Sequence, residues 1–313
     1  MRRAKDIGTS LATRISRSLR RGGDLARSGP AISSYEPSVD SRLLIIHCDD
    51  LGMAHSINGA TFRALEDGAI SSASVMVPCP WFAEVVEYAK QHPSIDLGIH
   101  LTLTSQSKDC KWRPITSKEL VPSLIDSQGY FPESTASLAG QARPEEVERE
   151  IGEQIEYAMR AGIHPTHLDH HMWALGQTPS LSSVYDKVAK AHGLPNRIPQ
   201  SDPEKLKTSA VPASGDGTAI RVLKAPANLR PDQWSEFYEG VLGSLKPGIN
   251  ELIVHLGYDD EELRAITRGR PGWDAAWRKR DFDVMCSRRF QRMIKKGGIR
   301  VVQWRDVIDH QGR

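Results

Sequence analysis

The residues best suited to chemistry are histidines and aspartates, and they gather at a few points of the sequence. One cluster holds four of the eleven histidines within eight residues, and other groups follow short apolar runs. These positions are His164, His167, Asp169, His170 and His171 in the cluster, and Asp49, Asp50, His100 and His255 elsewhere. Two imidazoles and a carboxylate can bind one divalent cation and leave positions for water and substrate. A second carboxylate can act as base and a further histidine as acid, which indicates a metal-assisted hydrolase.

Each of these groups also has a plainer explanation when it is taken singly. A histidine in a strand is usually structural, and two adjacent aspartates usually belong to a loop or a helix cap. The alternation of side chains between the two faces of a strand indicates which of these residues point to a polar interior. Apolar residues occupy every second position of the segment 97–104, so His100 lies on the opposite, polar face. In the segment 166–171, the same parity places His171 on the polar face and His170 on the other.

The elements that must position these residues alternate between strand and helix. The expected strands are 43–46, 73–77, 96–104, 166–171, 252–255 and 299–303, and the expected helices are 56–66, 80–90, 144–161, 181–192 and 281–296. Ser56 is expected to cap the first helix, and residues 200–230, rich in Pro, Ser and Lys, are expected to form an irregular insertion. This alternation predicts an α/β fold with mostly parallel strands, in which functional groups collect at the C-terminal ends of the strands.

Composition limits the class of protein. The chain has 313 residues, 41 Lys+Arg against 39 Asp+Glu, and 39% hydrophobic residues, which allows a sizeable core. Its four cysteines show no CxxC spacing, so a zinc ribbon or a disulfide scaffold is not indicated, and they suit a cytoplasmic location. No apolar run approaches the roughly 18–20 residues of a membrane helix.

Positive charge concentrates at the N-terminus. Residues 1–30 carry eight basic side chains against two acidic ones, and they lack the apolar segment of a secretory signal. We therefore expect residues 1–40 to be a disordered basic arm and residues 41–313 to be a single domain. A targeting peptide and an anion-binding arm remain alternatives for the arm. A nucleic-acid partner is not favoured, because such proteins carry their positive charge on folded surface.

Three sequence blocks resemble the signatures of the YdjC-like carbohydrate deacetylases, of the chitooligosaccharide deacetylase type. The blocks are Cys48–Gly52 (CDDLG), Gly98–Thr104 (GIHLTLT) and Pro165–Met172 (PTHLDHHM). The resemblance extends from about Leu43 to Val307. It implies a deformed β/α barrel that removes acetyl groups from N-acetylated mono- or oligosaccharides. It also implies one divalent metal ion, Mg²⁺ in the best-known members and Zn²⁺ or another ion in relatives.

The resemblance assigns roles by position. It implies metal ligands at Asp50, His100 and His171, a catalytic base at Asp49, an acid at His255 and a substrate contact at Arg197. The chain departs from the family pattern at His170, where a small residue is usual, at Met172, often a histidine, and at His47, commonly Asn. These changes leave the metal ligands in place and bear on sugar specificity. Trp112 and Trp173 are candidates for stacking on a sugar, although packing is the alternative for both.

Two other functions remain open at this point. The chain could be a metal-assisted hydrolase of another amide, ester or phosphoester, or a carbohydrate-binding protein without catalysis. The presence of both Asp49 and Asp50 argues against pure binding, since binding alone does not need the base. The sequence leaves the sugar, its length, the metal and the oligomeric state undetermined.

Overall fold

The computed structural model describes residues 41–197, 210–212, 219–270 and 272–309. The expectations for residues 1–40 therefore lie outside the described residues. Residues Val39–Arg313 group into one compact unit. None of the described helices combines the length and apolarity that a membrane crossing requires.

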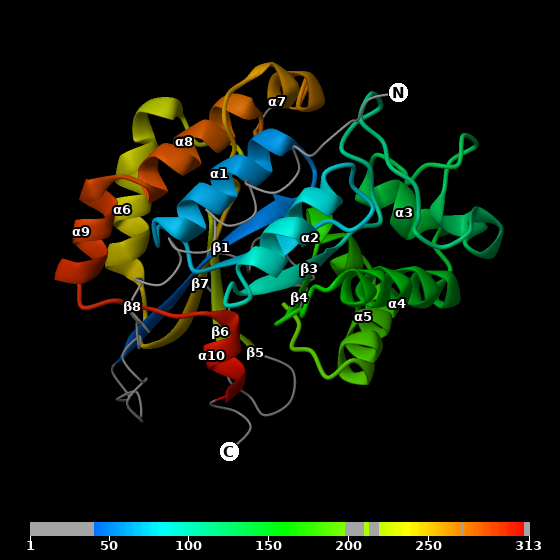
Figure 1. Cartoon of the computed structure of the whole chain (residues 1–313), viewed down its shortest axis with the longest axis horizontal. Coiled ribbons are helices and arrows are strands. Elements are labelled where there is room, and N and C mark those ends of the chain that lie inside the picture. Colours follow the sequence, from blue (N-terminus) through cyan, green and yellow to red (C-terminus); the bar gives the residue numbers. More distant parts are fainter. Residues whose placement is uncertain (1–40, 198–209, 213–218, 271, 310–313) are drawn as a thin grey trace, which may run out of the picture. The chain divides into compact units, whose positions relative to one another are not determined.

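One eight-stranded sheet forms the centre of this unit. Its strands are β1 (Arg42–Leu51), β2 (Ser72–Val75), β3 (Leu97–Leu101), β4 (Leu168–His170), β5 (Ala210–Pro212), β6 (Ala219–Lys224), β7 (Gly248–Val254) and β8 (Arg300–Val301). The order is β4-β3-β2-β1-β7-β6-β5, with β8 paired to β1. Neighbouring strands are parallel, except that β5 and β6 are antiparallel. The sheet curls into an incomplete barrel with helices outside it (Figure 1), which confirms the expected deformed β/α barrel.

Most helices lie between strands in the sequence and cover the outer face of the sheet (Figure 1), whereas the last helix follows the last strand and packs through Trp304 and Val307 against Leu43, Ile45 and Ile220. The helices are α1 (His55–Glu66), α2 (Phe82–Gln91), α3 (Thr135–Gln141), α4 (Pro144–Ala161), α5 (Pro179–Ala191), α6 (Trp234–Ser244), α7 (Glu261–Ile266), α8 (Ala275–Met285), α9 (Arg288–Lys296) and α10 (Trp304–Asp309). Helix α4 has the bounds predicted from sequence. It begins at a proline, carries acidic residues in its first turn and ends at Gly162 with φ 102°.

Two helix predictions were wrong in detail. The segment 281–296 is not one helix, because α8 ends at Met285 and Ser287 starts α9 by accepting the backbone N–H of Phe290. The first helix is not capped by Ser56. Its hydroxyl lies inside the first turn and donates to the carboxylate of Asp260 instead.

The prediction of an irregular insertion over 200–230 was also wrong where the structure describes it. Strand β6 runs through that region and pairs in parallel with β7. Its Ile220 and Val222 side chains are buried, so the strand forms part of the core. The six-residue strand was missed because it is short and follows residues rich in Pro, Ser and Lys, a composition typical of loops.

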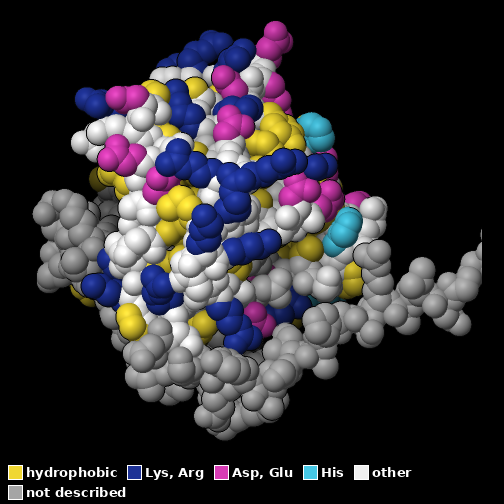
Figure 2. Space-filling view, turned by 90° about the vertical axis from the view of Figure 1, so that its left-hand side faces the viewer, with side chains coloured by type: hydrophobic (Ala, Val, Ile, Leu, Met, Phe, Trp, Pro, Cys, Tyr) yellow, Lys and Arg dark blue, Asp and Glu magenta, His cyan; other side chains and the backbone are white. Residues whose placement is uncertain are grey.

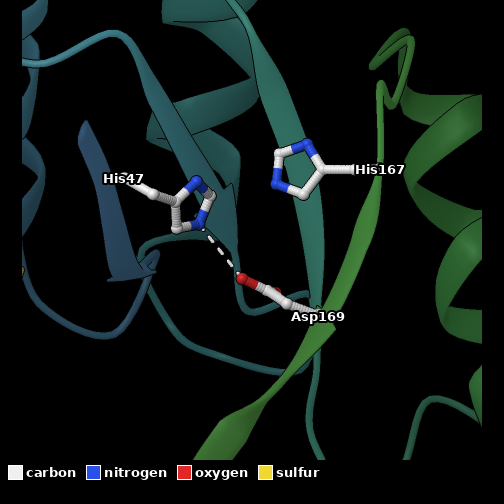
Figure 3. A group of neighbouring side chains, drawn as sticks. All are labelled: His47, His167 and Asp169. Atoms are coloured by element: carbon white, nitrogen blue, oxygen red, sulfur yellow. Dashed lines mark hydrogen bonds and ion pairs between the residues drawn. The ribbon is translucent and has the colours of Figure 1, made fainter. Parts of the chain in front are cut away.

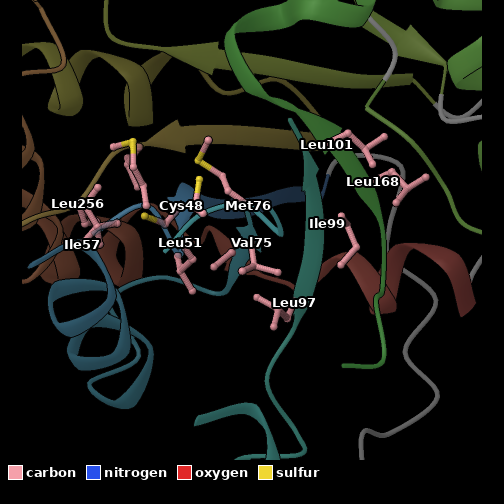
Figure 4. Packing of buried hydrophobic residues seen from close by; sticks show 14 of the residues in the cluster. Cys48, Leu51, Ile57, Val75, Met76, Leu97, Ile99, Leu101, Leu168 and Leu256 are labelled. Carbon is pink, nitrogen blue, oxygen red and sulfur yellow. The ribbon is translucent and has the colours of Figure 1, made fainter. Parts of the chain in front are cut away.

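The two faces of the sheet differ in polarity. On the outer face, Cys48, Leu51, Val75, Ile99 and Leu101 pack against one another and the helices (Figure 4). At one end of the strands, the inner face carries Leu43 and Ile45 in a small apolar cluster with Trp304. Toward the carboxyl ends, it carries histidines, serines and carboxylates that are buried and joined by hydrogen bonds. Covered parallel strands are ordinarily apolar on both faces. The buried polar part of the inner face therefore marks the region where function is to be sought.

The surface over α6, α8 and α9 carries both signs of charge. Figure 2 shows many Lys and Arg side chains there, interleaved with Asp and Glu. Arg289 of α9 pairs with Glu239 of α6, and within α8 Lys279 pairs with Asp283. Exposed pairs of this kind contribute about 0–1 kcal/mol each to stability.

Candidate active site

A bulge in β1 turns two adjacent aspartates toward the same face of the sheet. Successive strand residues ordinarily point to opposite faces, so Asp49 and Asp50 would normally be separated. The pairing with β2 shifts register between Cys48 and Leu51, and Asp50 has a φ of 74°. Such an extra residue re-aims a side chain and is common next to active sites. Both carboxylates consequently reach the polar interior.

Asp50 lies between two imidazoles. Its Oδ1 atom is 3.4 Å from His100 Nε2 and 3.1 Å from His171 Nδ1. Oδ2 accepts a 2.7 Å bond from Arg278 of α8. Burial opposes ionisation of Asp50, yet Arg278 and the two imidazoles hold its pKa well below the usual range. Asp50 is therefore an ionised carboxylate at neutral pH.

The parity argument predicted that His171 and not His170 enters the polar interior, but the segment is less extended than predicted and both residues line the cavity described below. Strand β4 ends at His170, and His171 opens a short 3₁₀ segment, η3 (His171–Gly176). His171 still reaches Asp50, whereas His170 Nδ1 accepts the backbone N–H of Leu175 at 3.3 Å. His167, which directly precedes β4, is also buried, and its ring stacks on that of Trp304.

Three buried groups among the described residues bring their ligand atoms close enough for a metal ion: Asp50, His100 and His171; Asp49, His100 and Asp169; and His47, His167 and Asp169. The first is the group that the resemblance implied. One ligand atom from each residue lies within 4.8 Å of the others, and all three side chains are buried. His171 faces Asp50 through Nδ1, and its other nitrogen, Nε2, is buried without a hydrogen-bond partner in the described structure, as are Nε2 of His167 and of His170. An unpaired buried nitrogen costs free energy unless something binds it. One carboxylate and two imidazoles are ligands that several divalent metals accept.

Asp49 lies beside this cluster and is held by two cationic groups. Arg197 Nη1 and His47 Nε2 are each 3.3 Å from Asp49 Oδ1. Burial opposes ionisation here too, but Arg197 and His100 keep the pKa of Asp49 far below its ordinary value. The carboxylate is unprotonated at neutral pH and is able to accept a proton.

Arg197 lies in the interior, where carboxylates surround its guanidinium. It was expected to contact substrate, but the guanidinium is buried, with its residue 3% exposed. It forms a two-pronged pair with Glu251 at 3.0 and 2.7 Å, and its Nη1 contacts Asp49 and Asp169. Three carboxylates occupy its donors, so this geometry supports a role in holding Asp49 in place of a substrate contact.

His255 follows directly after β7, at the carboxyl end of the strand. Its backbone N–H donates to Asp281 Oδ2 at 3.0 Å, and its ring meets that of Trp273 edge-on at 6.3 Å. Burial lowers the pKa of His255 to about 4 against the opposing effect of Asp50 and Asp49. At neutral pH the ring is therefore a neutral imidazole.

These groups share one cavity of about 240 Å³. Six of the eight residues to which the resemblance or the sequence assigned a site role line it, namely Asp49, Asp50, His100, His171, Trp173 and His255, and His170 lines it as well. Trp112 does not. Its indole donates to the Thr104 carbonyl at 2.9 Å and its ring packs edge-on against His171, so it fits the packing alternative.

Other lining residues were missed by sequence reasoning. Lys224 is the last residue of β6, and Arg278 lies in the first half of α8. Trp273, with φ 57°, belongs to no recognisable motif. Lys224 Nζ lies 5.3 Å from the ring centre of Trp173, which the sequence analysis had identified as a candidate. Only the position of Lys224 at a strand end carried a usable signal, and it fell in the segment taken for an insertion.

A second, larger hollow of about 680 Å³ lies between β6 and α6. Its wall includes Leu223, Leu229 and Phe237 but none of the aspartates and histidines of the cluster. We therefore take the smaller cavity as the candidate active site.

Comparison with known proteins places this site in a family context. The family model described as YdjC-like protein matches residues 43–296. A Thermus thermophilus protein named carbohydrate deacetylase is 35% identical over 276 residues, covering 85% of this chain and 94% of that one. A protein of the same name from Thermoanaerobacter pseudethanolicus is 27% identical, covering 72% of this chain and 85% of that one.

A solved structure supports the fold. It comes from Enterococcus faecalis V583 and bears the name of a candidate cellobiose-phosphate cleavage protein. It superposes with a TM-score of 0.69 at 24% identity, covering 85% of this chain and 99% of that one. The match of the family model over most of the chain, together with the Thermus relative, shows that this chain belongs to the YdjC-like protein family.

Proposed function

We propose that this chain is a metal-dependent hydrolase that removes acetyl groups from N-acetylated sugars. Its family membership and its relatives named carbohydrate deacetylase support the sugar substrate. The observation that carries the proposal is the adjacency of two carboxylates in different settings. Asp50 belongs to the cluster with His100 and His171 that suits a metal, and Asp49 lies outside that cluster but lines the same cavity.

Asp50, His100 and His171 would hold the ion. When bound, a divalent cation polarises a carbonyl and makes a water molecule more acidic. The donor set bears on which metal fits. Imidazoles suit Zn²⁺, Fe²⁺ and Ni²⁺, whereas Mg²⁺ prefers oxygen ligands, so this set accepts transition metals at least as readily as the Mg²⁺ implied by the family.

Asp49 would take the proton from the water that attacks the acetyl carbon. Arg197 and His47 keep this carboxylate ionised and fix its orientation. A positioned base of this kind typically contributes about 10²–10⁴ in rate. The amide carbonyl carbon becomes tetrahedral in this step, and its bond to the sugar nitrogen breaks in the next.

His255 would deliver a proton to the departing nitrogen, because an amine anion is too poor a leaving group to depart unassisted. A pKa of about 4 means that the resting imidazole carries no spare proton at neutral pH. His255 must therefore gain a proton during the turnover before it can act as the acid. The proton removed from water by Asp49 is the natural source, and its transfer would leave both groups ready for the next cycle.

Acetate release tests the proposal. Purified protein is incubated with N-acetylated mono- and oligosaccharides, and both acetate and the free amino group are measured. We expect the two products in equal amounts from at least one sugar, and none from Asp50→Ala. Release of acetate without a free amine would identify an ester substrate instead. No release from any sugar would favour a binding protein.

A further inference from the structure

A buried carboxylate beneath the site, Asp169, has no part in the reaction described so far. Its side chain is 0% exposed. Oδ1 accepts a 2.8 Å bond from His100 Nδ1, and Oδ2 accepts from Ser74 Oγ at 2.8 Å and from His47 Nε2 at 3.0 Å. Arg197 Nη1 lies 3.1 Å from Oδ2. Figure 3 shows the bond from His47 to Asp169. Four donors therefore meet on one carboxylate.

The hydrogen bond between Asp169 and His100 determines which nitrogen of the His100 ring can bind a metal. An ionised carboxylate only accepts hydrogen bonds, so the proton of a neutral His100 ring must lie on Nδ1. Nε2 then keeps its lone pair, and it lies 3.4 Å from Asp50 Oδ1, on the side of the candidate metal. Metal-binding histidines commonly donate their second ring N–H to a carboxylate, which fixes tautomer and orientation.

Two other partners of Asp169 also contact Asp49, the proposed base. Arg197 and His47 both contact Asp169, and both lie 3.3 Å from Asp49. The register of the sheet supports the arrangement, since Asp169 of β4 is paired with His100 of β3. A single side chain thus connects a candidate metal ligand with the two groups that hold the candidate base.

We propose that Asp169 is a positioning residue with two tasks. It fixes the Nδ1–H tautomer of His100 for metal binding, and it holds Arg197 and His47 where they contact Asp49. The inference rests on the proposed function, because it requires a metal at His100. In this proposal Asp169 binds neither the metal nor the substrate, although its carboxylate lies close enough to Asp49 and His100 to form a ligand group with them.

His167 supplies a matched control. It comes from the same chain segment, is equally buried and lies beside the same group (Figure 3). Its Nδ1 bonds to Thr166 Oγ1 at 2.9 Å, its Nε2 has no partner in the described structure, and its ring stacks on Trp304. His167→Gln disturbs the same buried region without removing a bond to His100 or Asp49.

The first experiment titrates metal-free protein with Co²⁺ and follows its visible absorption, which reports both affinity and ligand geometry. Asp169→Asn should weaken Co²⁺ binding about 10–100-fold, the usual cost of losing a partner of a metal-binding histidine. The absorption bands should shift as well. His167→Gln should keep the wild-type affinity and bands, even if thermal melting shows it to be less stable. Wild-type Co²⁺ affinity and bands in Asp169→Asn would overturn the proposal.

A second measurement covers the case in which Asp169→Asn does not fold. NMR of ¹⁵N-histidine-labelled wild-type protein loaded with Zn²⁺ should show His100 protonated at Nδ1. A His100 ring protonated at Nε2 would contradict the proposal without any variant.

His100→Ala separates this inference from the proposed function. Unchanged Co²⁺ affinity in His100→Ala would mean that the metal site itself is misplaced, and both proposals would fall. Loss of binding in His100→Ala with full binding in Asp169→Asn would remove the positioning role alone.

Discussion

Asp50 shows how one backbone position assembles a site. With φ at 74°, it holds a conformation that costs a non-glycine residue about 1 kcal/mol or more, and aspartate tolerates it better than most. The bulge brings Asp49 and Asp50 to the same face. Sequence reasoning identified both residues but could not foresee the bulge, because nothing in CDDLG distinguishes a regular strand from a bulged one.

Metal binding at His171 and not at His170 is the first prediction at this scale. His171 belongs to a group of ligand atoms that lie close together, whereas His170 belongs to none of the groups found among the described residues, and its Nδ1 accepts from the Leu175 amide. His171→Ala should weaken binding by more than about 100-fold, since even an indirect partner is worth about 10–100-fold. His170→Ala should bind nearly as well as wild type. Metal analysis after dialysis measures both, and the opposite order of the two variants would show that the ligand is misassigned.

The second prediction concerns Asp49. Asp49→Asn is nearly isosteric but cannot accept a proton from water, so turnover should fall about 10²–10⁴-fold. Metal content should stay near that of wild type, because the proposed ligands are Asp50, His100 and His171; loss of metal in the variant would favour the alternative group of Asp49, His100 and Asp169. Turnover is followed as acetate release and metal content by elemental analysis. Normal turnover in the variant would exclude Asp49 as the base.

At the scale of elements, the sequence predicted more of the barrel's first half than of its second. Helix α4 was placed with its observed bounds, because a proline, an acidic first turn and a terminal glycine mark it clearly. The division between α8 and α9 and the strand β6 were missed. The first depends on a local serine cap at Ser287, and the second on pairing with β7, a partner distant in sequence.

A pair of glycines tests the packing of these elements. A Cβ atom on Gly98 of β3 would lie 2.4 Å from His167 Nε2, whereas one on Gly152 of α4 would meet nothing within 4 Å. Gly98→Ala should therefore destabilise the protein by about 1–3 kcal/mol through overpacking. Gly152→Ala should stabilise it by about 0.4–1 kcal/mol, as alanine favours the helix. Urea unfolding of both variants measures the difference, and equal stabilities would argue against the close approach of β3 and His167.

At the scale of the whole molecule, Asp281 couples stability to pH. It accepts hydrogen bonds from Trp234, Tyr238 and the His255 backbone, and burial raises its pKa to about 6. Between about pH 4 and 6 the unfolded chain loses this proton while the folded protein keeps it. The contribution of Asp281 to the free energy of unfolding is therefore complete below about pH 4. It falls by about 3 kcal/mol as the pH rises through about 6.

Asp281→Asn should remove this decline. Urea unfolding of wild type and variant, both in chelator, gives a difference in unfolding free energy at each pH from about 4 to 7.5. Other titrating groups cancel in that difference, so wild type should lose about 3 kcal/mol relative to the variant across the range. A difference that does not change with pH would show that Asp281 titrates normally in the folded protein.

The central claim is that a divalent ion at Asp50, His100 and His171 is needed for deacetylation. The most direct test removes the metal from purified protein with a chelator, measures acetate release from an N-acetylated sugar, and then restores metal in measured amounts. We predict no turnover without metal, and recovery that is complete at one equivalent per chain in wild type and absent in His100→Ala. Metal-free protein that releases acetate at the rate of the untreated protein would contradict the account.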